Sequence, residues 1–159
     1  MIKVLFITFS AIFLLATANL RLSAISYADP EEKCRPTESD ALGPFYKPDA
    51  LVRSSVGKGY ILSGIVKSST DCSPIAKARI EFWLVGPDSK YDDDHRATVF
   101  SGKDGTYRFE SNFPKSYFGR PPHIHILISA GGFRRLVTQH YPLKGTNQGT
   151  FDLVLVPER

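Results

Sequence analysis

From Gly59 to its end the sequence is a succession of short strand-like segments separated by turn-forming residues. Gly, Pro and Asp punctuate apolar and alternating stretches, and the Asp104-Gly105 pair is a typical tight hairpin connection. No segment after residue 28 shows a sustained amphipathic helical period. The sequence therefore predicts an all-β fold, an antiparallel β-sandwich of about seven to eight strands. The seven segments that we expect to form strands are residues 60–67, 78–85, 97–101, 106–111, 123–130, 133–140 and 149–156.

Two segments precede the expected sandwich, which occupies residues 59–159. Residues 1–28 combine Lys3, an apolar run and small residues that end at Ala28, the order of a secretory signal peptide. An uncleaved membrane anchor is the alternative, because the apolar run approaches the length of a membrane span. Residues 29–58 are rich in Pro, Asp and Gly without a sustained period, so we expect an irregular N-terminal arm packed on the domain.

Charge and cysteine content indicate the compartment and exclude one class of partner. Without Lys3 and Arg21 of the signal segment, 18 of the 20 Lys and Arg residues remain against 16 Asp and Glu, and the basic residues are dispersed. This balance argues against a nucleic-acid partner. We expect a secreted or periplasmic protein, without stable membrane association if the signal is cleaved. In an oxidising compartment Cys34 and Cys72 are expected to form a disulfide.

The candidate functional site begins with two histidines at the start of an expected strand. His123 and His125 are two residues apart, so their side chains share one face and could hold one metal ion. Tyr117 and Arg120 lie just upstream, on a segment that Gly119 and two prolines make irregular.

Tyrosines are the informative candidates for completing this metal site. Tyr117 is close to the histidines in sequence, and Tyr91 lies in a loop between Lys90 and three aspartates. A phenol becomes a ligand at neutral pH only for a strongly Lewis-acidic cation, which favours ferric iron over zinc or calcium. Each tyrosine alone could equally be a residue at the margin of the core. Phe45 and Tyr46, after a Gly-Pro step in the arm, could cover an apolar cavity or fill the core edge.

The ordered set of motifs resembles the intradiol ring-cleavage dioxygenases, the family of catechol and protocatechuate dioxygenases, and the short secreted members in particular. The resemblance runs from about Cys34 to Tyr141. Its most specific part is the block from Arg120 through the two prolines to His125. It is also carried by Thr37-Glu38, Leu42-Gly43-Pro44-Phe45-Tyr46, Ile80-Glu81-Phe82-Trp83 with Tyr91, Asp104-Gly105-Thr106-Tyr107-Arg108-Phe109, and Pro114 with Tyr117.

The resemblance implies an enzyme that opens catecholic rings between the two hydroxylated carbons with O2, giving cis,cis-muconate-type products. It implies an Fe(3+) cofactor held by Tyr91, Tyr117, His123 and His125. Tyr117 would be the displaceable ligand that takes up a substrate proton, and Arg120 would stabilise charge that develops on the ring. Gln139 falls near the position of a family glutamine that supports the substrate pocket. The implied partners are a catecholic small molecule and O2, with a homodimer as the candidate assembly.

The step from Tyr117 to Arg120 is much shorter than in protocatechuate dioxygenases, which leaves the substrate open. Two other functions compete with the dioxygenase. The segment from Gly59 to Phe82 also resembles non-enzymatic transthyretin-like binding modules. A zinc hydrolase could use the histidine pair, but it would need a third ligand, with His95 and His140 as the only other histidines.

Overall fold

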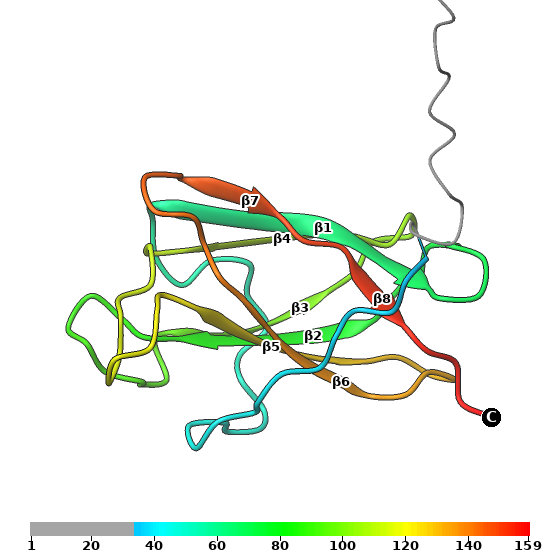
Figure 1. Ribbon diagram of the computed structural model, residues 1–159, viewed down its shortest axis with the longest axis horizontal. Helices are drawn as coiled ribbons and strands as arrows, with labels where there is room; N and C mark the ends of the chain where they lie inside the picture. Colours follow the sequence, from blue (N-terminus) through cyan, green and yellow to red (C-terminus); the bar gives the residue numbers. More distant parts are fainter. Residues whose placement is uncertain (1–33) are drawn as a thin grey trace, which may run out of the picture.

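The computed structural model describes residues 34–159, so the expected signal peptide lies outside the described residues. This part of the chain forms eight strands in two sheets, and it contains no helix (Figure 1). The predicted all-β sandwich is thus confirmed. The strands are β1 (Tyr60–Ser68), β2 (Arg79–Leu84), β3 (Arg96–Phe100), β4 (Thr106–Ser111), β5 (Ile124–Ser129), β6 (Leu136–His140), β7 (Gln148–Thr150) and β8 (Leu153–Leu155).

The two sheets pack their apolar faces together to form the core. One sheet has the order β4-β1-β7, with β8 also paired to β1, and the other has the order β3-β2-β5-β6. Residues of β1 alternate between buried and half-buried positions, as a strand with one face in the core requires. The stacked rings of Phe82 and Phe109, 4.3 Å apart, join the two sheets at the centre of this core.

The last predicted strand differs from the expectation in direction and in continuity. Residues 149–156 were expected to form one strand of an antiparallel sandwich, but β7 and β8 both run parallel to β1. The ladder breaks between them because the Ile65 amide donates to the carboxylate of Asp152, 2.9 Å away, instead of to a backbone carbonyl. The Asp152 carboxylate also pairs with Lys67 at 2.5 Å, which holds the break in place.

Two other strands begin later than predicted. The strand expected from residue 123 begins at Ile124, because His123 directly follows Pro121 and Pro122 and bonds its ring to the Pro121 carbonyl. The strand expected from residue 133 begins at Leu136, because the Phe133 amide closes a turn on Ala130 instead.

The arm wraps across both sheets. Its backbone bonds in turn to β8 through Thr37, to β6 through Asp40, and to β4 through Val56 (Figure 1). Tyr46 of the arm packs on Trp83, with ring centroids 5.3 Å apart, and donates to the buried carboxylate of Glu81. The outer face of β2 is therefore covered, which explains why almost every residue of this strand is buried.

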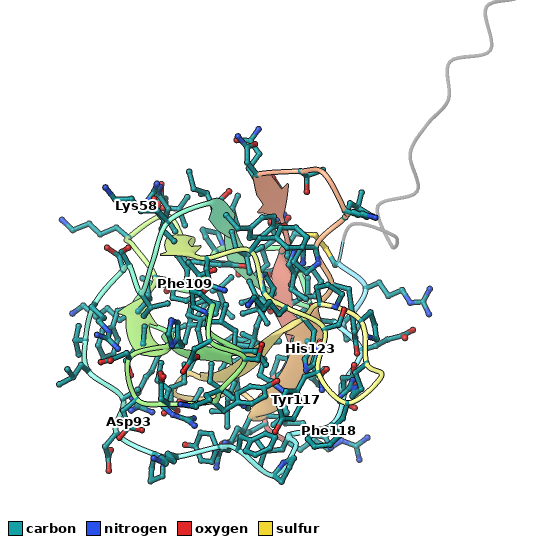
Figure 2. All side chains as sticks on the ribbon, turned by 90° about the vertical axis from the view of Figure 1, so that its left-hand side faces the viewer. Lys58, Asp93, Phe109, Tyr117, Phe118 and His123 are labelled. Carbon is teal, nitrogen blue, oxygen red and sulfur yellow. A yellow bond between two sulfur atoms is a disulfide. The ribbon has the colours of Figure 1, made fainter. Side chains whose placement is uncertain are left out.

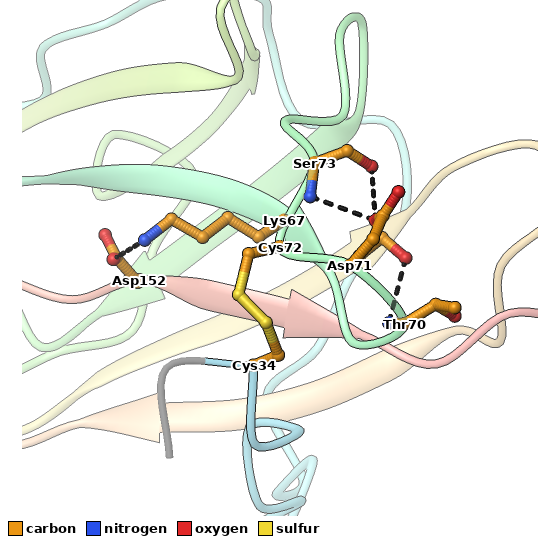
Figure 3. Close-up of a disulfide and its surroundings, with 8 residues drawn as sticks. Cys34, Lys67, Thr70, Asp71, Cys72, Ser73 and Asp152 are labelled. Atoms are coloured by element: carbon orange, nitrogen blue, oxygen red, sulfur yellow. Dashed lines mark hydrogen bonds and ion pairs between the residues drawn. A yellow bond between two sulfur atoms is a disulfide. The ribbon is translucent and has the colours of Figure 1, made fainter. Parts of the chain in front are cut away.

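A disulfide joins the start of the described arm to the loop after β1 (Figure 3). The Cα atoms of Cys34 and Cys72 are 5.2 Å apart, and 38 residues separate the two cysteines. The loop is shaped by Asp71, whose carboxylate accepts hydrogen bonds from the amide and the hydroxyl of Ser73. The disulfide thus fastens the arm to the sheet that contains β1. Within residues 34–159, no helix is long and apolar enough to cross a bilayer.

Candidate metal centre

The loops from β2 to β3 and from β4 to β5 lie at the same end of the sandwich, the left-hand end in Figure 1. The first loop carries Tyr91, and the second carries Tyr117 and leads into the histidine pair. Figure 2 looks onto this end and shows Tyr117, Phe118 and His123 gathered there. Residues that are far apart in the sequence therefore meet at one end of the two sheets.

Three of the four predicted ligands bring their donor atoms together. Nε2 of His123 and Nε2 of His125 are 3.1 Å apart, and the Tyr91 hydroxyl lies 3.2 Å from the first and 3.4 Å from the second. Donor atoms that share one ion at bond lengths of about 2 Å lie about 3 Å from each other. The spacing of these three atoms fits one bound metal ion.

The hydrogen-bond partner of His123 determines which of its ring nitrogens is free to bind a metal ion. Its Nδ1 lies 2.7 Å from the carbonyl oxygen of Pro121, so Nδ1 carries the hydrogen and donates it. Nε2 is then an unprotonated acceptor that faces Nε2 of the neighbouring histidine. A metal-binding histidine commonly donates its other ring N–H to a carbonyl in this way.

Burial keeps these groups uncharged when no metal is present. It lowers the pKa of His125 to about 3, and the nearby charges of His123 and Arg120 act in the same direction. Burial also lowers the pKa of His123. It raises the pKa of Tyr91 to about 12, so this phenol loses its proton at neutral pH only to a strong Lewis acid.

Tyr117 lines the same site, but its hydroxyl makes no hydrogen bond to any residue in the range 34–159. Its ring packs edge-on against Tyr91, with centroids 5.2 Å apart. A tight turn carries it: the amides and carbonyls of Tyr117 and Arg120 bond to each other, with positive φ at Phe118 and Gly119. The prediction that Tyr117 belongs to the site is consistent with this placement, whereas its ligand role stays a prediction.

The two tyrosines and the two histidines line a cavity of about 370 Å³, a size suited to a small organic molecule. Among the described residues that form its wall, Arg120 is the only one with a Lys, Arg, Asp or Glu side chain, and Phe118 is 90% exposed at its edge. The lining residues are Gly43, Pro44, Phe45, Tyr91, Tyr117, Phe118, Arg120, His123 and His125.

The two aromatic residues of the arm have different roles. Phe45 lines the cavity and stacks on Tyr91, with centroids 4.4 Å apart. Tyr46 lies behind the site instead, against Trp83, which stacks on His125 at 4.8 Å. Gly43 has a φ of +73°, and a Cβ there would lie 3.0 Å from Cε1 of His125. A glycine is therefore needed where the arm passes the histidine.

The structure places Gln139 beside Arg120, and Gln139 is not among the described residues that line the cavity. The Arg120 guanidinium donates to Oε1 of Gln139 at 2.8 Å. It also donates to the hydroxyl of Tyr141, which bonds in turn to Asp40. Sequence reasoning missed these last two residues. Tyr141 follows Gln139 by two positions, a spacing that could have placed it on the same side of the chain, whereas nothing in the sequence pointed to Asp40.

The remaining histidines do not complete a zinc site. His95 pairs with Asp92, and His140 shares a hydrogen bond with the hydroxyl of Tyr60. Among residues 34–159, no cluster of three or more His, Cys, Asp or Glu side chains is placed to hold a metal ion. In the described part of the chain, the two histidines are therefore joined by a tyrosine, not by a third nitrogen or a carboxylate.

Comparison with known proteins gives a consistent set of relatives, although no family model matches the chain. It is 28% identical to hydroxyquinol 1,2-dioxygenase of Rhizobium sp. (strain MTP-10005) over 155 residues, covering 76% of this chain and 51% of that protein. It is 31% identical to hydroxyquinol 1,2-dioxygenase of Nocardioides simplex, covering 64% of this chain and 46% of that protein. The chain thus spans about half the length of the curated relatives it matches.

Solved structures share the fold over about three quarters of the chain. The dioxygenase domain of a dioxygenase carbohydrate-binding protein fusion from Streptomyces sp. SirexAA-E matches with a TM-score of 0.68 and 28% identity, over 77% of this chain and 99% of that domain. An intradiol ring-cleavage dioxygenase from Tetranychus urticae shares the fold with a TM-score of 0.70 at 17% identity, over 78% of this chain and 96% of that one. By sequence and by fold, the chain is similar to intradiol ring-cleavage dioxygenases.

Proposed function

We propose that this protein is a ferric-iron intradiol dioxygenase that opens catecholic rings between their two hydroxylated carbons. One observation carries the proposal: three donor atoms, from Tyr91, His123 and His125, converge within 3.1–3.4 Å of one another beside a cavity. Packing alone gives no reason to bury two imidazole nitrogens and a phenol oxygen face to face, because such groups lose their bonds to water.

The donor set fits ferric iron better than the other common metals. Tyr91, Tyr117, His123 and His125 would hold the ion, and the two phenolates would offset two of its three positive charges. The raised pKa of Tyr91 requires a strong Lewis acid for ionisation, which a ferric ion supplies. When bound, the iron would provide the site at which both oxygens of a catechol and the electron density of its ring are engaged.

Two side chains act on the substrate itself in this proposal. The phenolate oxygen of Tyr117 would accept a proton from one of the two catechol hydroxyls, so that this oxygen of the ring binds in its deprotonated form. The guanidinium of Arg120 lines the cavity and stabilises negative charge that develops on the ring during cleavage; among the described residues of the wall it is the only Lys or Arg side chain. Gln139 holds this guanidinium through the bond at 2.8 Å.

The cavity indicates an aromatic substrate with little charge of its own. Phe45, Tyr91 and Phe118 offer aromatic contacts, and Pro44 adds apolar surface. The relatives named for hydroxyquinol and chlorocatechol act on rings of this type. Catechol and hydroxyquinol are therefore the first substrates to test, with protocatechuate as the carboxylated comparison.

Secretion and assembly belong to the same proposal. The disulfide between Cys34 and Cys72 favours an oxidising compartment, which agrees with an N-terminal signal peptide. A homodimer remains the candidate assembly.

Ferric reconstitution combined with oxygen uptake tests the proposal. Purified protein titrated with ferric iron should turn red at about one equivalent, because tyrosinate-to-iron charge transfer absorbs visible light. The red protein should then consume O2 with catechol or hydroxyquinol. A protein that stays colourless and consumes no O2 with any of the three substrates would overturn it, and zinc-loaded protein is the matched control.

A further inference from the structure

The guanidinium of Arg120 is held by two acceptors at the end of β6. One of its terminal nitrogens donates to Oε1 of Gln139 at 2.8 Å and to the Tyr141 hydroxyl oxygen at 3.0 Å. An unrestrained arginine has several rotatable bonds and loses about 2 kcal/mol of rotamer entropy when it is fixed. These two bonds fix the charge that faces the cavity before a substrate arrives.

The hydroxyl of Tyr141 has one hydrogen and two acceptors within reach. Oδ2 of Asp40 lies 2.8 Å away, and Oε1 of Gln139 lies 3.0 Å away. An ionised carboxylate is the stronger acceptor. When the hydrogen is donated to Asp40, the oxygen atoms of both Tyr141 and Gln139 are free to accept from Arg120.

Asp40 is ionised at neutral pH. Its slight burial acts to raise its pKa, but hydrogen bonds from the Ala41 amide and the Tyr141 hydroxyl, together with the charge of Arg120, hold the pKa below its ordinary value. Oδ1 accepts from the Ala41 amide at 2.6 Å, which leaves Oδ2 for the tyrosine. The carboxylate is thus oriented as well as charged.

The same short segment of the arm fixes the second acceptor. Nε2 of Gln139 donates to the carbonyl oxygen of Ala41 at 2.6 Å, so its Oε1 points to Arg120. The Asp40 amide donates to the carbonyl of Val137, which anchors the segment along β6. Asp40 and Ala41 therefore determine the orientation of both groups that hold the arginine.

We propose that Asp40 and Tyr141 are positioning residues that fix the Arg120 guanidinium toward the substrate cavity, with Asp40 acting through the Tyr141 hydroxyl. This inference rests on the proposed function and extends it from the residues of the cavity to a carboxylate of the N-terminal arm. The arm then has a second role besides covering the sheet, because it sets the direction of the charge that acts on the ring.

Two substitutions test the proposal, and each has a matched control in the arm. Y141F removes only the hydroxyl, and D40N removes only the charge. E38Q changes an exposed carboxylate two residues before Asp40, and Y46F removes a hydroxyl that bonds to Glu81.

Y141F should lower kcat by about tenfold with little change in KM, since one bond to a charged group that acts in the transition state is lost. The controls should stay near the wild-type value, and the visible band of the ferric protein should not move in any of the four.

A double-mutant cycle tests whether Asp40 acts through Tyr141. If it does, D40N lowers kcat in the wild-type background but has no further effect when added to Y141F. Equal effects of D40N in both backgrounds would overturn the relay.

Side-chain NMR of Arg120 separates this proposal from the proposed function, because it needs neither iron nor turnover. The order of the Arg120 Nε–H group in the metal-free protein should decrease in Y141F and D40N and stay unchanged in E38Q and Y46F. Unchanged order in Y141F would overturn the positioning role. Decreased order with unchanged kcat in an active enzyme would overturn its link to catalysis. A wild-type protein without dioxygenase activity would instead contradict the proposed function, while the NMR result still decides whether Arg120 is positioned.

Discussion

At the scale of single residues, the site depends on the directions of a few donor atoms. His123 carries its hydrogen on Nδ1, bonded to Pro121, and this leaves its Nε2 facing His125 and Tyr91. The proline that delays the start of β5 thus also orients the first histidine. A change of the ring's partner could alter the tautomer, and with it which of the two ring nitrogens offers its lone pair to a metal.

Replacing Tyr117 with Phe tests whether Tyr117 is the proposed fourth ligand; its hydroxyl has no partner among the described residues. The ring should still pack against Tyr91 and Phe45, so the fold should be unchanged. Loss of one phenolate should weaken and shift the visible band of the ferric protein. Loss of the proton acceptor should lower kcat by about a hundredfold or more.

Absorption spectroscopy and oxygen uptake check this prediction side by side. Y46F serves as the control because Tyr46 packs behind the site and does not line the cavity. A Y117F protein with the wild-type spectrum would show that Tyr117 is not a ligand.

At the scale of elements, the sequence predicted the strands well and their pairing less well. Turn residues such as Asp104-Gly105 and alternating apolar positions locate most strands to within a residue or two. Whether a strand pairs in parallel is decided by distant partners, and the break between β7 and β8 depends on a side-chain bond from Asp152 to Ile65 that no local pattern encodes.

In the candidate site, too, local features could be predicted from the sequence, whereas long-range contacts could not. His123 and His125 could be paired from their spacing alone, because period two on a strand is a local property. Tyr91 reaches them from a different loop, so the residues alone made it a candidate, and only the resemblance to a known family assigned it to the site. Asp40 remained unnoticed because its partner, Tyr141, lies 101 residues away in the sequence.

The disulfide that fastens the arm should contribute to the free energy of unfolding. Replacing Cys34 and Cys72 together with Ser should lower the free energy of unfolding by about 4 kcal/mol, because the cross-link closes a loop of this length in the unfolded chain. Denaturant titration with and without the substitutions measures the loss.

The double variant should lose stability but keep the ability to bind iron. The arm keeps its backbone bonds to β8 and β6, so the folded double variant should still bind iron and turn red. A double variant as stable as the wild type would contradict the expected contribution of the cross-link. A reducing agent should reproduce the loss in the wild-type protein.

At the scale of the whole molecule, buried histidines should make the metal-free fold sensitive to acid. Burial lowers the pKa of His140 to about 4, from an ordinary value of 6.5, and Nε2 of the ring lies 2.7 Å from the Tyr60 hydroxyl, with which it shares a hydrogen bond. Between these two pH values the unfolded chain binds more protons than the folded one. Stability should therefore be full above about pH 6.5 and fall progressively toward pH 4.

Thermal unfolding of the metal-free protein at several pH values checks this dependence. H140Q should flatten the slope between pH 6.5 and 4, even if it lowers stability at neutral pH, because the group that gains a proton on unfolding is gone. Identical slopes for H140Q and the wild type would assign the acid sensitivity to other groups.

The two sheets, the arm and the cavity together serve one proposed reaction, the cleavage of the bond between two hydroxylated ring carbons with incorporation of one atom of O2 into each of the two new carboxylates. The most direct test is the mass of the product formed from catechol under ¹⁸O2 by the ferric protein. We predict a ring-opened dicarboxylate of the cis,cis-muconate type that contains two ¹⁸O atoms, one in each carboxylate. A ring-opened aldehyde, a product with fewer than two labelled atoms before exchange with water, or unreacted catechol would contradict the proposed function.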